Sequence, residues 1–513
     1  MTTDKNKYVG QSALIEKYGL QVPSPSLMSV VGPGARKTTT ENGVTIEKYT
    51  ASYAPKDTLA GHLKFSLRYE PTDLGVLSDL FKVADHRELE DWIRSEPNGA
   101  YSRRAWFLYE WLTDKTLDIP DLGAVTYINA LDEKFHITAT DGRQSRRHKV
   151  IDNLLGTRTF CPTVRRTEQI KSFQAEALNS EASELVSGCD PDILTRAVNF
   201  LYTKETKSTF QIENEVASGM RAERFVAALR GAEKFDLSDP TRLLSLQNSI
   251  VDPRYAATGI RDFQNFIGET AGGYREIVHF ICPKPEDVPS LLSGWADMAS
   301  KLRGHVDPVV SAALVSFGFV FIHPFEDGNG RIHRFLMHNI LSSEGYTPKD
   351  VLFPISAAIV RDRRGYDAAL ESFSAAIQPF IEWSWTPEKE ISVKNDTCDL
   401  YRYFDATTIT EYLYSKIKET VRKDLRDELS FIGMYDAISQ EIKERIDMPD
   451  RRASLLAQLL IQGKGALSQK ALTKFSELTE LEIKIIQKVA TDVLEEFDLQ
   501  NDFDTSDSMY RPE

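Results

Sequence analysis

Cysteine is scarce in this chain and widely scattered. The 513 residues hold no CxxC pair and no histidine at zinc-ligand spacing, and the cysteines are Cys161, Cys189, Cys282 and Cys398. This pattern argues against a disulfide framework or a structural metal, and it predicts a reducing environment.

Long hydrophobic segments are also missing. The N-terminal stretch "MTTDKNKYVG" is polar and lacks the apolar core of a signal peptide. The longest uncharged apolar run covers residues 309–322, which is shorter than the roughly 20 residues that cross a bilayer. We therefore expect a cytoplasmic protein with no membrane segment.

An excess of positive charge is absent as well. Lysine and arginine number 62 against 76 aspartate and glutamate, which gives a net charge of -14 and argues against nucleic acid as a partner. The basic run "GRQSRRHKV" (142–150) is either a solvated surface or a docking patch for an acidic partner. Residues 463–487 have helix-turn-helix spacing, but packed helices produce the same spacing.

Repeats and low-complexity tracts are not found, and the periodicity is mostly helical. Residues 20–45 are interpreted as a loop-rich lead-in, residues 57–114 as helices and residues 124–139 as a strand pair. We predict an N-terminal accessory domain (1–170), a central domain (171–390) and a C-terminal helical domain (391–513).

The predicted fold class is mainly α, with an all-helical core. One β-hairpin is expected near residues 264–282, because two apolar runs flank Gly272-Gly273 and prolines follow. The N-terminal domain is expected to be mostly helical with some strand.

The stretch "FGFVFIHPFEDGNGRIHRFLMHNIL" (317–341) concentrates the chemistry. The apolar run before it predicts a buried helix that stops near His323, because proline disfavours helical geometry in the preceding residue. A histidine at a helix end can face a cleft and accept a proton near neutral pH. Phe325 is expected to anchor the loop to the core.

Acidic and small residues follow the histidine. A carboxylate such as Asp327 beside a phosphate site typically holds Mg²⁺. Gly328 and Gly330 tolerate positive φ, which would turn backbone N–H groups inward as an anion nest. Asn329 can cap the next helix or hold the shape of the loop.

Two arginines complete the segment. Arg331 and Arg334 are three residues apart on the helix that follows, so they share a face above its electropositive N-terminus. The ordered set predicts a site for a nucleotide triphosphate, whereas any one of these residues alone would fit a polar surface loop.

Residues 323–334, "HPFEDGNGRIHR", match the Fic signature HxFx(D/E)GNGRxxR at every defined position. The chain thus resembles Fic-domain protein adenylyltransferases, in a long bacterial form. The resemblance covers roughly residues 240–360, and the predicted hairpin resembles the Fic flap. It implies transfer of AMP from ATP to a Tyr, Ser or Thr hydroxyl of a target protein or of the enzyme itself.

The resemblance also implies roles for the site residues. The target segment would dock on the flap hairpin by strand addition. The roles are His323 as the base, Asp327 as the Mg²⁺ ligand, Gly328, Asn329 and Gly330 as the phosphate cradle, Arg331 at the β/γ end and Arg334 at the γ-phosphate.

A second short motif precedes the core. "KSTFQIENEVASG" contains Thr209, Glu213 and Asn214 in the (S/T)xxxE(G/N) pattern of Fic inhibitory helices, here expected near residues 205–220. Glu213 is expected to pair with Arg334 and to displace the γ-phosphate. In some Fic proteins the same glutamate supports removal of AMP, so the resemblance leaves a second role for Glu213 open.

Other interpretations remain at this point. A kinase or another nucleotide transfer would use the same phosphate site, although relatives with other chemistry usually depart from GNGR. A non-enzymatic regulator or toxin–antitoxin component with a vestigial nucleotide site is the alternative from a different class. His338 is either part of an adenine pocket or a satisfied core histidine.

Overall fold

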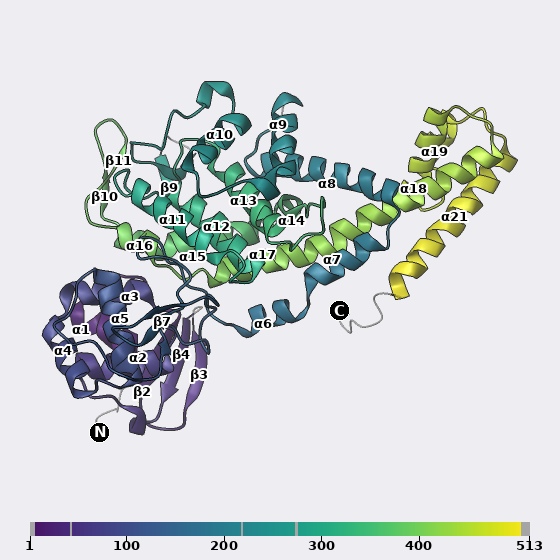
Figure 1. The fold of residues 1–513 in the computed structure, drawn as a ribbon. Coiled ribbons are helices and arrows are strands. Elements are labelled where there is room, and N and C mark those ends of the chain that lie inside the picture. The colour runs from purple at the N-terminus through teal and green to yellow at the C-terminus, as the bar shows by residue number, and fades with distance from the viewer. Residues whose placement is uncertain (1–5, 42–43, 217–218, 272–274, 504–513) are drawn as a thin grey trace.

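The computed structural model describes residues 6–41, 44–216, 219–271 and 275–503. Figure 1 shows an N-terminal lobe in purple, a helical body in teal and green, and an arm of helices that extends from the body and ends in yellow. The chain is predominantly α-helical, as predicted, and its strands form small sheets and hairpins.

β-Branched residues build a sheet where a lead-in loop was predicted. The sheet has the order β1-β2-β4-β3, and β2 and β4 run parallel to each other. Its strands are β1 (Lys7–Val9), β2 (Leu27–Val31), β3 (Lys37–Glu41) and β4 (Val44–Tyr49). The loop prediction for residues 20–45 is wrong, because these short Val- and Thr-rich runs pair with one another despite the glycines between them.

The helices predicted over residues 57–114 are confirmed. They pack around a core that includes Leu63, Leu80 and Trp106. The helices of this lobe are α1 (Gly10–Tyr18), α2 (Leu59–Tyr69), α3 (Leu74–Val83), α4 (His86–Ser95) and α5 (Ala100–Thr113).

The strand pair predicted over residues 124–139 is wrong. Only β5 (Ile128–Asn129) forms there, and it pairs in parallel with β7 (Val150–Asp152). β7 also pairs with β6 (Arg143–Ser145), so the partner strands come from further along the chain. The alternating pattern of the segment did not reveal which strand would be its neighbour.

The basic run at 142–150 turns partly inward. Arg147 Nη2 lies 3.1 Å from Glu110 Oε1, and His148 Nε2 lies 3.0 Å from Glu110 Oε2. Arg147 also covers the ring of Trp106, at 4.8 Å from the centroid. These two side chains thus hold α5 to the small sheet, and neither a solvated face nor a docking patch describes them.

The helical body is built around one apolar helix, α12 (Pro308–Ile322). Its start is set by Asp307, whose Oδ1 accepts hydrogen bonds from Val309 N at 2.9 Å and Val310 N at 3.4 Å. Pro308 at the first helical position suits this start. Every residue from 309 to 322 is buried, which confirms the predicted buried helix.

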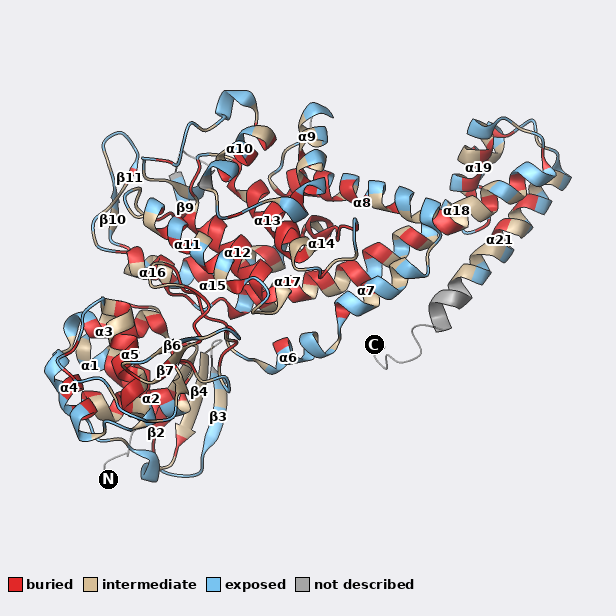
Figure 2. Cartoon of the chain, viewed as in Figure 1, coloured by how far each residue is buried: buried red, intermediate tan, exposed pale blue. Residues whose placement is uncertain are grey.

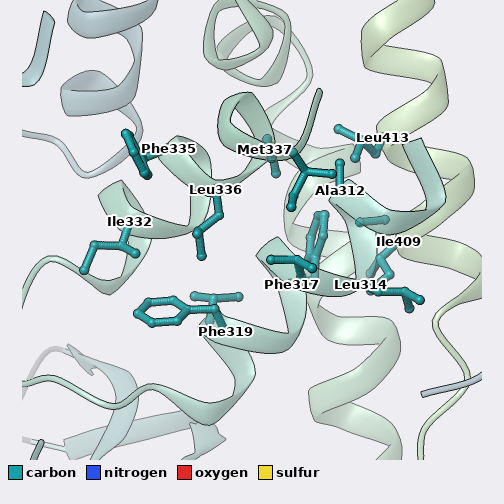
Figure 3. Close-up of a cluster of buried hydrophobic side chains, with 14 of the residues drawn as sticks. Ala312, Leu314, Phe317, Phe319, Ile332, Phe335, Leu336, Met337, Ile409 and Leu413 are labelled. Carbon is teal, nitrogen blue, oxygen red and sulfur yellow. The ribbon is translucent and has the colours of Figure 1, made fainter. Parts of the chain in front are cut away.

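α12 packs against its neighbours on several sides. Figure 3 shows Phe317 and Phe319 of α12 meeting side chains of α13 (Asn329–Ser343) and of α17 (Thr407–Glu419). The other helices of the body are α6 (Glu168–Ala175), α7 (Leu178–Ser187), α8 (Pro191–Ile212), α9 (Gly219–Arg230), α10 (Pro240–Ile250), α11 (Val288–Leu302), α14 (Ile355–Arg361), α15 (Arg363–Ile377) and α16 (Cys398–Arg402).

Two hairpins lie on the body. β8 (Phe266–Ala271) and β9 (Arg275–Ile281) are antiparallel, which confirms the predicted hairpin, and the Gly272-Gly273 turn lies outside the described residues. A second hairpin, β10 (Trp383–Trp385) with β11 (Ile391–Val393), was not predicted.

The core of the body includes residues from both flanking regions. Ile137 and Phe160 belong to the same buried cluster as Phe317, and so do Ile409 and Leu413 of α17. Figure 2 shows α12, at the centre of this cluster, almost entirely in red, the colour of buried residues. Side chains from before residue 170 and after residue 390 thus complete this core. The domain boundaries at those two residues stay a prediction.

A separate cluster forms the arm. A π-helical turn (Thr420–Leu425) joins α17 to α18 (Arg426–Arg445), and α19 (Asp450–Gln462), α20 (Gln469–Lys474) and α21 (Glu480–Phe503) follow. Ile438, Leu456 and Ile486 lie in its core. Among the helices of the described ranges, none has the length and apolar character needed to cross a membrane.

Candidate active site

The turn after α12 holds His323. His323 has left-handed backbone angles, φ 51° and ψ 60°, and Pro324 follows it, so the helix ends where the sequence predicted. Phe325 is 2% exposed and fixes the turn to the core, as expected. The histidine side chain is thereby placed at the end of a rigid buried helix.

The protonation of His323 follows from its contacts. Nδ1 lies 3.2 Å from the carbonyl oxygen of Val320. Because a carbonyl can only accept, Nδ1 carries the hydrogen and Nε2 is the acceptor of the ring. Burial lowers the pKa of His323 to about 4. A neutral imidazole with an accepting Nε2 can take a proton from a hydroxyl group near neutral pH.

Asn329 holds the shape of the loop, which settles the two roles that the sequence left open. Its Nδ2 donates to the carbonyl of Phe325 at 2.8 Å, and its Oδ1 accepts from Phe325 N at 3.1 Å. The amide closes the loop on itself and is 2% exposed. The backbone N–H of Asn329 is therefore what the loop can offer to a phosphate at the N-terminus of α13.

The two glycines of the loop serve different purposes. Gly328 has φ +86°, and a Cβ there would lie 2.8 Å from Val251 Cγ1. The positive φ predicted for Gly330 is wrong, because Gly330 lies in the first turn of α13. A Cβ at Gly330 would instead lie 2.5 Å from Glu213 Oε1, so the missing side chain makes room for that carboxylate.

Glu213 bridges both arginines of the motif. Arg334 Nη2 lies 2.5 Å from Glu213 Oε1, and Arg331 Nε lies 2.9 Å from Glu213 Oε2. The guanidiniums are almost fully buried, at 0% exposure for Arg331 and 2% for Arg334. Although burial lowers the pKa of Arg334, the carboxylate of Glu213 raises it, and the net shift is upward. The expected pair with Arg334 is present, and Arg331 joins it.

Thr209 adds a second contact from the same helix. Arg334 Nη2 donates to the Thr209 carbonyl at 3.1 Å, and Arg334 Nε donates to Thr209 Oγ1. α8 ends at Ile212, Glu213 caps it, and Asn214 has φ 57°, so the segment leaves the helix at the motif itself. The first, fifth and sixth positions of the (S/T)xxxE(G/N) pattern each have a structural use here.

Asp327 is an accessible carboxylate of the kind that can hold Mg²⁺. Its side chain is 40% exposed, and its Oδ1 lies 2.9 Å from Arg331 Nη2 and 2.6 Å from Gly328 N. Within the described residues, no group of three or more His, Cys, Asp or Glu could hold a metal ion. One accessible carboxylate suits Mg²⁺, which is commonly bound by one or two carboxylates together with phosphate oxygens and water.

Glu215 is a further carboxylate near the arginines that sequence reasoning missed. Its Oε1 lies 3.6 Å from Arg331 Nη2, and its Oε2 accepts from Arg221 Nη1 at 2.9 Å. The sequence signal that could have identified Glu215 was its position two residues after Glu213. This pair holds the segment after Glu213 close to the site.

Arg261 is the second missed residue, and it braces the turn. Its Nε donates to the His323 carbonyl at 2.8 Å, and its backbone N–H donates to the Pro324 carbonyl at 2.9 Å. Its guanidinium also donates to the carbonyls of Phe263 and Pro283, at 2.8 and 2.7 Å, on the two sides of the β8–β9 hairpin. Arg261 is 5% exposed. A lone arginine before a hairpin gives no sequence signal for this role.

His338 is a satisfied core histidine. It is 4% exposed, and its Nε2 lies 2.8 Å from Glu205 Oε1. The other oxygen of Glu205 accepts from Ser356 N at 2.8 Å. His338 therefore joins α13 to α8 and α14, and its ring nitrogen is engaged there.

Part of the chain is similar in sequence to known proteins. Residues 239–341 match the model of the Fic/DOC family. "Protein adenylyltransferase Fic" of Nematostella vectensis is 35% identical over 119 residues, 22% of this chain and 26% of that protein. "Protein adenylyltransferase fic-1" of Caenorhabditis elegans is 33% identical over 90 residues, 17% of this chain and 16% of that protein. The matched part thus spans about a quarter or less of these relatives.

Two Fic proteins are among the solved structures that this chain matches. A Fic family protein from Desulfovibrio desulfuricans G20 covers 68% of this chain and 98% of its own, with a TM-score of 0.34 and 19% identity. Fic-1 from C. elegans covers 72% of this chain and 95% of its own, with a TM-score of 0.31 and 17% identity.

Proposed function

Since residues 239–341 form a Fic/DOC domain, we propose that this protein is an adenylyltransferase. It transfers AMP from ATP to a Tyr, Ser or Thr hydroxyl of a target protein or of itself. The sequence relatives carry the name protein adenylyltransferase. The observation that carries the proposal is that a neutral His323, the N-terminus of α13 and two arginines lie within one short segment.

Phosphates are bound at the start of α13. Gly328 lets the backbone turn, and the N–H groups of Asn329 and Gly330 lie at the electropositive helix end. Arg331 and Arg334 supply two planar guanidiniums that suit phosphate oxygens. Mg²⁺, held by Asp327 and phosphate oxygens, would supply positive charge at the α- and β-phosphates.

His323 acts as the base. Its Nε2 takes the proton of the target hydroxyl while the hydroxyl oxygen forms a bond to the α-phosphorus. The bond from the α-phosphorus to the bridging oxygen breaks, and pyrophosphate leaves. Such a transfer needs positioning and charge stabilisation more than covalent chemistry by the protein.

Glu213 inhibits this reaction in the state described here. Its two oxygens neutralise the two guanidiniums that the phosphates need, and its negative charge lies where the γ-phosphate would lie. The enzyme becomes active when the segment around Glu213 leaves the arginines. A carboxylate held this close to the phosphate site could also position water, which is how Glu213 would support removal of AMP.

The target hydroxyl is presented by the β8–β9 hairpin. An extended target segment adds to this hairpin as a strand, and Arg261 keeps the hairpin base in register with His323. Self-modification follows when a hydroxyl of the same chain or of a second copy takes this place.

The test uses the full chain carrying Glu213→Gly, Mg²⁺ and ATP labelled at either the α- or the γ-phosphate. We expect label from the α-position alone, on the protein itself or an added substrate, and no label when His323→Ala is added. Label from the γ-position alone would overturn the proposal in favour of a kinase. Absence of label from both positions would count for the non-enzymatic alternative.

A further inference from the structure

Exposed apolar side chains gather around the β8–β9 hairpin. Ile260, Phe263, Ile267 and Ile277 are between 38% and 43% exposed, and Trp385 of the neighbouring hairpin is 40% exposed. Single exposed apolar residues are common on protein surfaces. A group of them beside a proposed active site is instead typical of an interaction surface.

The second hairpin holds Trp385 in a defined position. Trp385 lies opposite Ile391, which is 3% exposed, and Trp383 lies opposite Val393. The turn is closed by Thr386 N, which donates to the Glu390 carbonyl at 2.8 Å, with Lys389 at φ 65°. The Trp383 and Trp385 rings meet edge to face with centroids 5.6 Å apart. The exposed indole is thus fixed before any partner binds.

The two hairpins are in contact, and the segments that flank the second hairpin also bond to β9. The rings of Phe266 and Trp385 meet edge to face with centroids 5.5 Å apart. Gln378 Nε2 donates to the Val278 carbonyl at 3.3 Å, and Tyr401 Oη donates to the Ile281 carbonyl at 2.6 Å. Figure 1 shows β10 and β11 beside β9 at the same end of the body. The apolar surface therefore continues from the β8–β9 hairpin onto the β10–β11 hairpin.

The same surface is connected to the catalytic turn. Arg261 lies between Ile260 and Phe263 in the sequence and donates to the carbonyls of His323 and Phe263. A segment lying across these hairpins would therefore be held in a fixed relation to His323.

Carboxylates predominate around this apolar surface. Among exposed described residues of the two hairpins, their flanks and the catalytic loop, the acidic ones include Asp262, Glu269, Glu326, Glu382, Glu388 and Glu390. The exposed lysines in the same set of residues are Lys389 and Lys394. A partner with basic residues beside apolar ones complements this charge.

We propose that the β10–β11 hairpin is a second docking element that selects the target. It takes an extended segment in which aliphatic or aromatic residues flank the hydroxyl and lysine or arginine lies at the ends. The apolar residues rest on Trp385 and the β8–β9 hairpin, and the basic ends meet the carboxylates. This inference rests on the proposed AMP transfer, since it names the class of substrate for that site.

Two readouts test it on the full Glu213→Gly chain. The probes are synthetic peptides of about 12 residues, long enough for one strand and both flanks. Both series have isoleucines beside a central hydroxyl residue, which is Tyr, Ser or Thr. One series has lysines at the ends, and the other has glutamates at the ends. Binding is measured by fluorescence anisotropy without ATP, and transfer is measured with α-labelled ATP.

Matched variants separate docking from a general loss of fold. Trp385→Ala is compared with Phe431→Ala, which removes an aromatic side chain of similar exposure, 37%, on α18. The double change Glu388→Lys with Glu390→Lys is compared with Glu480→Lys on the arm.

We expect the lysine-ended series to bind roughly tenfold more tightly than the glutamate-ended series. Trp385→Ala should remove most of the affinity for the lysine-ended series, whereas Phe431→Ala should not. The Glu388/Glu390 change should reverse the preference for peptide ends. Equal binding of both series, or unaltered binding by Trp385→Ala, would overturn the docking proposal even if self-modification proceeds. Peptide binding without any α-label transfer would instead support docking and count against the proposed reaction.

Discussion

His323 combines a left-handed backbone with a half-buried ring, and both affect its chemistry. Burial lowers its pKa to about 4, whereas an unfolded chain protonates histidine near 6.5. The neutral ring therefore contributes stability that is complete above pH 6.5 and is lost as the pH falls toward 4. At neutral pH the ring is ready to accept a proton.

We predict that the ring of His323 stays neutral from pH 8 down to about 5. The measurement is an NMR titration of the chain with ¹³C-labelled histidine, in which His323→Gln identifies the signal. A midpoint near 6.5 would show that the ring is solvated, and the structural basis for its role as a base would then fail.

We predict that Arg261 acts as a positioning residue. Arg261→Met in the Glu213→Gly chain should lower α-label transfer by about two orders of magnitude, because a shift of the catalytic group by about 1 Å has that effect. Arg261→Lys keeps the charge but not the fork of donors, and it should recover part of the rate.

The control for Arg261 is Arg87→Lys, since Arg87 has a side chain 80% exposed in the N-terminal lobe. The NMR signal of His323 should move in Arg261→Met. The temperature at the midpoint of thermal unfolding should stay near the parental value in Arg261→Lys. A parental rate in Arg261→Met would contradict the bracing role.

The residues of the motif could be placed from sequence because their order alone sets their geometry. Proline ended α12 at His323, and the spacing of Arg331 and Arg334 put both on one face of α13. Arg261 and Glu215 could not be found in this way, since their partners are backbone carbonyls and side chains that only the folded chain brings near. The need for glycine at position 330 was also hidden, since it arises from the approach of Glu213 to the space that a Cβ would fill.

Among the elements, α8 carries the contacts that hold Glu213 against the two arginines. It carries Thr209 and ends at Glu213, and Glu205 within it is 0% exposed and contacts His338 and Ser356. Arg363 Nη1 also donates to the Ile212 carbonyl at its end. These polar contacts hold the helix to α13, α14 and α15.

We predict that Glu205→Ala loosens α8 and partly activates the enzyme. Removing the carboxylate leaves His338 and Ser356 without their buried partner, which should cost about 2 kcal/mol. Hydrogen exchange of α8 should rise, and α-label transfer should exceed that of the wild type while staying below that of Glu213→Gly.

Thr203→Ala is the control for Glu205→Ala, since Thr203 is an exposed residue of the same helix. Faster exchange without any gain in transfer would show that α8 is not the inhibitory element. Unaltered exchange would show that the Glu205 contacts do not hold it.

Elements with a strong local pattern were predictable, and those defined by distant partners were not. The uncharged run of α12 and the two apolar runs of the β8–β9 hairpin carry their own signal. β5 is two residues long and exists only because β7 lies beside it. β10 and β11 are each three residues long, too short to stand out by alternation.

At the scale of the whole molecule, separate hydrophobic cores determine which helices each part needs in order to fold. The core of the body includes Ile409, Leu413, Tyr414 and Ile417 of α17, each at most 2% exposed. The core of the arm begins at Ile438 and includes Leu456 and Ile486. The sequence showed helices in both regions but not which core each helix would join.

We predict that a chain ending at residue 445 folds and transfers AMP in the Glu213→Gly background, whereas a chain ending at residue 390 does not fold. Loss of α17 removes apolar side chains worth roughly 2 kcal/mol each, and the total approaches the 5–15 kcal/mol stability typical of a domain. Circular dichroism melts and size-exclusion chromatography measure both chains. A folded 390-residue chain, or an unfolded 445-residue chain, would contradict this division.

The proposal that unites these results is that one site, with His323 as its base, is closed by Glu213. Its most direct test is the initial rate of α-label transfer by the wild type, Glu213→Gly, and Glu213→Gly with His323→Ala, measured side by side with Mg²⁺ and ATP. We expect Glu213→Gly to be at least about tenfold faster than the wild type, as release of charged hydrogen bonds implies, and the double variant to transfer nothing. Equal rates for the wild type and Glu213→Gly, or persistent transfer without His323, would contradict it.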